Sequence, residues 1–101
     1  MGGNSINEKD LLISISNGNE LAFGKLFSQY KDTVYSIGLA LTANTFDAEE
    51  VVQEVFSRIW RYKETLPNII VFDFWIKTVA RNRGLTLLKR KAVEIKKRHI
   101  Y

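Results

Sequence analysis

The stretch Asp47–Trp60, DAEEVVQEVFSRIW, decides the fold, because its apolar residues recur with the spacing of one α-helical stripe. Asp47 occupies the expected N-cap position, and Glu50 lies three residues later, an arrangement that resembles a capping box. The stripe consists of Ala48, Val51, Val52, Val55, Phe56, Ile59 and Trp60. The pattern predicts an amphipathic helix that buries this stripe in a core. Its acidic, glutamine-bearing outer face is then free for another role.

Two helices are predicted before this stretch. Glu8–Ser16 has the spacing of a short helix capped by Asn7, and the turn Asn17–Asn19 follows it, with Gly18 in the left-handed conformation. Glu20–Ala43 has the spacing of a long helix. We assign its aromatic residues Phe23, Phe27, Tyr30 and Tyr35 to the core, and we expect Gly24 and Gly38 to permit close helix packing.

The second half of the chain predicts a loop and one more helix. Asn44–Phe46 is expected to be a short connection, and the helix that begins at Asp47 is expected to run to about Glu64. Pro67 then stops helical continuation within a loop, Thr65–Ile70. The last helix should span about Val71 to Arg98, with Phe72, Trp75, Ile76, Val79, Ala80 and Leu87 on one face.

No segment alternates with the two-residue period of a strand, so the predicted fold class is all-α. We expect a compact bundle of one short and three longer helices. A chain of 101 residues is long enough for one domain. Within it, residues 1–19 would form an N-terminal segment with the short helix, and residues 20–101 the main helical domain.

The charge of the chain is divided between its two ends. Residues 1–76 carry a net charge of −4, whereas residues 77–101 carry +8. Such a basic segment favours a polyanionic partner. Because the chain has no Cys and no apolar run long enough for a membrane span, we expect a cytoplasmic protein with neither disulfides nor thiolate metal sites.

Residue types that carry catalysis are scarce. The single histidine, His99, lies in a basic run, and there is no glycine-rich phosphate loop. Glu49, Glu50 and Glu54 share a helix but lack the Glu-x-x-His pairs of a helical di-metal site. We therefore expect no catalytic residue, metal, cofactor or small-molecule substrate.

The basic last helix has three interpretations. It could be a solvated face, a membrane-surface helix or a nucleic-acid surface. Clustered cations, aromatic residues at the helix start and Asn82 among the cations favour nucleic acid. The exposed edge would comprise Thr78, Arg81, Asn82, Leu85 and Lys89, while Arg83 and Arg90 lie nearer the core side and would reach phosphates or acidic neighbours.

Three segments together resemble region 2 of bacterial sigma factors, most closely the extracytoplasmic-function group of the sigma-70 family. They are AFGKLFSQYKDTVYSIGLAL (22–41), DAEEVVQEVFSRIW (47–60) and FDFWIKTVARNRGLTLLKRK (72–91). The resemblance covers about Glu20 to Lys91 and implies an all-helical domain. Such a domain docks on the clamp coiled coil of the largest RNA polymerase subunit. It also opens the promoter −10 element and holds the non-template strand.

The resemblance assigns residues to both tasks. The polymerase-binding residues would be Asp47, Glu50, Gln53, Glu54 and Arg58. The DNA-binding residues would be Lys63, Asn68, Phe72, Asp73, Phe74, Lys77, Arg81, Asn82, Arg83, Lys89 and Arg90. An anti-sigma factor is a further expected partner, since such control is common in the family.

The sequence departs from the family pattern in two places. Family members often have Asp four residues after the asparagine, where this chain has Thr86, and the loop TLPNIIVF is unusually apolar. A complete sigma factor also has a second, helix-turn-helix domain, for which this chain has no room. We therefore expect a piece of a longer protein or a stand-alone domain. The alternatives are a regulator that binds duplex DNA and a protein-interaction adaptor.

Overall fold

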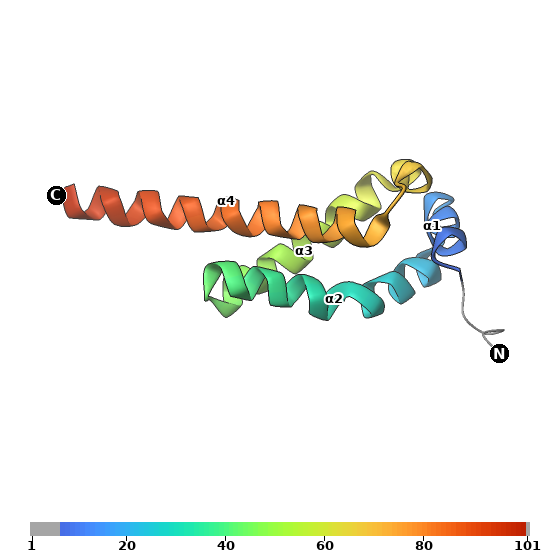
Figure 1. Cartoon of the computed structure of the whole chain (residues 1–101), viewed down its shortest axis with the longest axis horizontal. Helices are drawn as coiled ribbons and strands as arrows, with labels where there is room; N and C mark the ends of the chain where they lie inside the picture. Colours follow the sequence, from blue (N-terminus) through green and yellow to red (C-terminus); the bar gives the residue numbers. More distant parts are fainter. Residues whose placement is uncertain (1–6, 101) are drawn as a thin grey trace.

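Within the described part of the chain, the fold consists of four α-helices and one 3₁₀-helix (Figure 1). The computed structural model describes residues 7–100, with the side chains of residues 7–98. The elements are α1 (Glu8–Ser16), α2 (Glu20–Thr42), α3 (Thr45–Arg61), the 3₁₀-helix η2 (Lys63–Asn68) and α4 (Phe72–Ile100). No strand occurs in residues 7–100, and the all-α prediction is confirmed.

Asparagine side chains cap the N-termini of the first three helices. Asn7 accepts a hydrogen bond from the backbone N–H of Lys9 at 2.8 Å, as predicted, and Asn19 caps α2. Asn44 caps α3 by accepting from the backbone N–H of Asp47 at 2.9 Å. The predicted cap at Asp47, and with it the Asn44–Phe46 connection, is therefore wrong. Ala43 adopts the left-handed conformation, with φ 51°, and this turns the chain so early that α3 begins at Thr45.

The end of α3 also differs from the prediction. The helix ends at Arg61 instead of Glu64, and most of the predicted loop is the 3₁₀-helix η2. The short-range bond from the Ile69 N–H to the Leu66 carbonyl, 3.1 Å long, tightens this segment. The tight turn directs Leu66 inward, where only 1% of its surface is exposed. The segment before α4 is thus anchored to the core rather than loose.

The core lies where α2 packs against both α3 and α4, while α1 packs against η2. Its largest fully buried side chains are Ile15, Leu26, Val34, Val51, Val55, Ile59, Leu66 and Ile76. Tyr30 is buried as predicted, but Phe27 is 36% exposed because its ring lies at the edge of the core, against Phe56. Gly38 packs closely against Val51 as predicted, whereas Gly24 faces open space, and that prediction is wrong.

Helix α4 extends well past the ends of α2 and α3 (Figure 1). The described part of the chain is consequently elongated, with a longest extent of 61 Å. All side chains from Leu88 to Arg98 are exposed. Among the described helices, none combines the length and the apolar character required to cross a membrane.

A partly buried hydrogen bond joins α1 to α2. The Tyr30 hydroxyl donates to Glu8 Oε2 at 2.6 Å. Burial, this hydrogen bond and the nearby carboxylates of Glu8 and Asp73 raise the pKa of the Tyr30 phenol above its ordinary value. The phenol therefore remains neutral when the chain is folded, well beyond the pH at which an unfolded tyrosine ionises.

We expect the Tyr30→Phe variant to lose about 1–2 kcal/mol of unfolding free energy at neutral pH, because the hydrogen bond to Glu8 disappears. Since the folded pKa is raised, the contribution of Tyr30 is complete below about pH 10 and declines as the pH rises further. Urea titrations of both proteins between pH 7 and 11 would measure this. A difference that is constant over the whole pH range would contradict the assignment.

Candidate functional site

The outer face of α3 is exposed at three of the five residues predicted there. Glu50, Gln53 and Arg58 are exposed, while Asp47 and Glu54 are half-buried. Among the described side chains, those of Gln53 and Arg58 take part in no hydrogen bond or ion pair. These two residues are thus available to a partner without the loss of an internal contact.

Arg83 connects the acidic face of α3 to α4. Its Nη2 donates to Glu54 Oε1 at 2.6 Å and lies 3.5 Å from Glu50 Oε2, and its Nε is also ion-paired with Glu54. The side chain of Arg83 is only 24% exposed. The sequence-based alternative that Arg83 binds acidic neighbours is therefore the one that the structure shows. In this geometry its guanidinium faces α3 and is not free for phosphates.

An open groove of about 760 Å³ lies between α3 and α4. Residues from both predicted sites line it. Its walls include Gln53 and Arg58 from α3 and Asn82 from α4. The groove is also lined by four residues that were not among the predicted site residues, namely Ser57, Arg61, Tyr62 and Thr86. Ser57 and Arg61 follow Gln53 at intervals of four residues, so extension of the helical stripe would have identified them.

The predicted DNA-binding residues of η2 and α4 are mostly accessible. Exposed side chains are Asn68, Asp73, Phe74, Lys77, Arg81, Asn82, Lys89 and Arg90. Lys77 Nζ forms an ion pair with Asp73, 3.0 Å away, one turn earlier on the helix. The prediction that Phe72 binds DNA is wrong. Only 3% of Phe72 is exposed, because its ring packs against Tyr30 and Trp75. It is a core residue and does not reach the surface.

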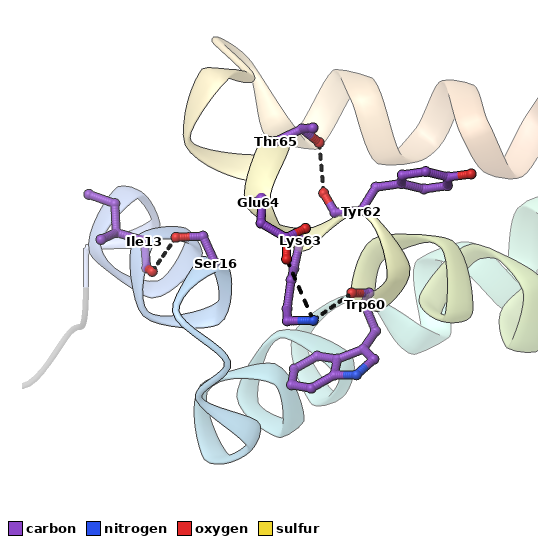
Figure 2. Close-up of polar contacts among 7 residues, drawn as sticks. All are labelled: Ile13, Ser16, Trp60, Tyr62, Lys63, Glu64 and Thr65. Atoms are coloured by element: carbon purple, nitrogen blue, oxygen red, sulfur yellow. Dashed lines mark hydrogen bonds and ion pairs between the residues drawn. The ribbon is translucent and has the colours of Figure 1, made fainter.

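Lys63 is held against the protein, as Figure 2 shows. Its Nζ lies 4.4 Å from the centre of the Trp60 ring and 3.4 Å from the Trp60 carbonyl oxygen, to which it donates. The Glu64 carboxylate lies 4.0 Å away on the other side. Cation–π and charge contacts thus fix this side chain at the end of α3, so it would have to leave them to contact DNA.

Apolar side chains are unusually exposed where η2 joins α4. Ile70, Val71 and Phe74 are 97%, 58% and 70% exposed. Next to them, α1 and η2 enclose a smaller hollow of about 350 Å³ that includes Asn68 and Ile70. The unusually apolar loop TLPNIIVF was the feature of the sequence that indicated this patch. Exposed apolar groups of this kind can contact bases as well as protein.

The described residues contain no cluster of acidic and histidine side chains that could hold a metal ion. The side chain of His99, the single histidine of the sequence, lies outside the described part.

Comparison with known proteins identifies related sequences. Residues 26–93 match the family Sigma-70 region 2. The ECF RNA polymerase sigma factor SigW of Bacillus subtilis is 24% identical over 83 residues, which cover 82% of this chain and 44% of SigW. The ECF RNA polymerase sigma factor SigE of Mycolicibacterium smegmatis is 30% identical over 71 residues, which cover 69% of this chain and 27% of SigE.

A third relative is the probable RNA polymerase sigma factor RfaY of Xanthomonas campestris pv. campestris. It is 31% identical over 65 residues, which cover 64% of this chain and 16% of RfaY. The chain therefore spans less than half the length of each of these relatives. No solved structure is significantly similar to the chain.

Proposed function

Because the chain belongs to the sigma-70 region 2 family, we propose that it binds core RNA polymerase through α3 and opens the promoter −10 element through η2 and α4. The observation that carries the proposal is the groove between α3 and α4. There the exposed groups of α3 stand next to Asn82 of the basic helix. A domain with this arrangement can hold a protein partner and DNA side by side.

The polymerase-binding surface proposed here is the outer face of α3. It offers the carboxylate of Glu50, the amide of Gln53 and the guanidinium of Arg58, all exposed. Glu54 contributes less directly, since its carboxylate is engaged by Arg83. Polar and charged side chains of both signs suit a partner helix with complementary charges. The proposed partner is the clamp coiled coil of the largest polymerase subunit.

The DNA-binding surface proposed here is the exposed side of α4 together with the segment before it. Lys77, Arg81 and Lys89 would contact phosphates. Exposed Phe74 offers a ring on which an unpaired base can stack, and Asn82 can hydrogen-bond to a base edge. Base capture of this kind offsets the unstacking of a promoter, which costs a few kcal/mol for each step.

Polymerase binding is tested most directly by a Gln53→Ala, Arg58→Ala double variant. We expect its affinity for core polymerase to fall about tenfold, because two interface side chains are truncated. These residues are preferable to Glu54, whose substitution would also break the contact with Arg83. Binding would be measured by the retention of purified core polymerase on the immobilised chain.

The matched control is Lys25→Ala with Gln29→Ala, which removes one cation and one amide from the exposed side of α2. We expect this variant to bind polymerase like the unmodified chain. Full retention by the α3 variant, or an equal loss in both variants, would refute α3 as the polymerase-binding surface.

A further inference from the structure

A continuous apolar stripe runs from the last core-packed turn of α4 into its projecting part. Leu85, Leu88, Ala92 and Ile95 follow one another at steps of three, four and three residues, which is the a and d spacing of a heptad. Leu88 is 40% exposed and Ile95 is 48% exposed, and both lie beyond Leu87, the last buried residue of the helix. The stripe therefore continues into solvent, where α4 has left the core.

Only basic residues flank this stripe. Lys89 and Lys96 occupy the e positions on one side, and Lys91 and Arg98 occupy the g positions on the other. None of these four cations is ion-paired within the described residues. In helix pairs that interact through such seams, e and g residues select the partner by charge. The stripe Leu85, Leu88, Ala92 and Ile95 is called the seam below. Its basic flanks favour a partner helix that has carboxylates on both sides of an apolar stripe.

The other possible occupants fit less well. In a second copy of this chain, identical basic flanks would face each other and repel. Nucleic acid would use the cations but would leave the apolar stripe in water. A helix without tertiary contacts is only marginally stable in water, and repulsion between neighbouring cations weakens it further. A covering acidic helix would satisfy the seam and both flanks.

We propose that residues 85–98 of α4 dock an acidic amphipathic helix, with apolar side chains at its a and d positions and carboxylates at e and g. Most of this docking surface lies on the part of α4 that projects past α2 and α3 (Figure 1). It shares Lys89 with the proposed DNA-binding surface, so a bound helix would compete with DNA there. The proposal itself does not depend on the proposed function.

A synthetic helical peptide with Leu at a and d and Glu at e and g tests the docking surface. We expect the 101-residue chain to bind the labelled peptide, as measured by fluorescence anisotropy, and to bind it more weakly as salt is raised. A peptide with Lys in place of every Glu should not bind. Equal binding of the two peptides, or binding of neither, would overturn the proposal.

Substitutions in the seam locate the contact. We expect Leu88→Ser with Ile95→Ser to weaken peptide binding about tenfold or more, because two apolar side chains no longer become buried. Val93→Ser is the matched control, since Val93 is 53% exposed on the same stretch but lies off the stripe. Circular dichroism would verify that all variants keep their helix content. A loss with Val93→Ser as large as that with the seam variant would refute the seam.

Two charge variants test whether the residues that flank the stripe, rather than the net charge of the helix, govern peptide binding. Lys91→Glu with Lys96→Glu reverses flanking positions, whereas Arg90→Glu with Lys97→Glu makes the same change of net charge on the back of the helix. We expect only the first variant to lose about fivefold in peptide affinity at low salt. Equal losses in both would show that net charge alone governs binding, and would overturn the proposal. Polymerase binding by both variants would be measured in parallel. If it is retained, a loss of peptide binding cannot be attributed to a loss of the proposed function.

Discussion

Replacement of Gly38 by Leu is expected to lower the free energy of unfolding by about 3 kcal/mol, because α2 and α3 touch at this position. A Cβ atom added to Gly38 would lie 3.1 Å from Val51 Cβ and 3.2 Å from Ala48 Cα. The Ala48 contact is with backbone, so no side-chain rotation can relieve it. The rest of the leucine side chain could be accommodated only by separating the two helices.

The same substitution at Gly24 is the control, because both glycines lie within α2. A Cβ atom at Gly24 would meet nothing within 4 Å, and we expect Gly24→Leu to be neutral or to stabilise the protein by up to about 1 kcal/mol. Urea denaturation of the three proteins measures the difference. Similar free energies for the two variants would show that α2 and α3 do not pack closely at Gly38.

The second large effect is expected in DNA binding. We expect a single-stranded oligonucleotide to bind more tightly than its duplex, and Lys77→Ala with Arg81→Ala to weaken binding about tenfold or more. Removal of two phosphate contacts should also reduce the slope of log affinity against log salt by about 1.4. Anisotropy titrations over a range of salt concentrations give both quantities.

Lys25→Ala with Lys31→Ala removes two exposed cations from α2 and is the control for net charge. We expect it to leave the salt slope nearly unchanged, since these residues lie outside the proposed DNA-binding surface. Equal affinity for the single strand and the duplex would instead favour a regulator that binds duplex DNA. Equal losses in both variants would indicate that DNA responds only to the overall charge of the chain.

The helices could be predicted from the sequence because their apolar spacing is a local property. The core stripe of α3 was predicted correctly for Val51, Val55 and Ile59, all of which are buried. The start of α3 was predicted incorrectly, because Asn44, Thr45 and Asp47 are all residue types that cap helices. The choice among them depended on the left-handed turn at Ala43, which no residue preference for alanine would indicate.

By itself the sequence determined the all-α class, the helical periodicities, the family resemblance and the concentration of positive charge in α4. These properties depend on residues within a few positions of one another or on composition. Only the tertiary structure decided that Arg83 binds Glu54, that Phe72 is buried and that α4 leaves the core after Leu87. Arg83 and Glu54 are 29 positions apart, and their contact exists because α3 and α4 lie side by side. Such pairings depend on how faces meet in space, which helical spacing alone does not specify.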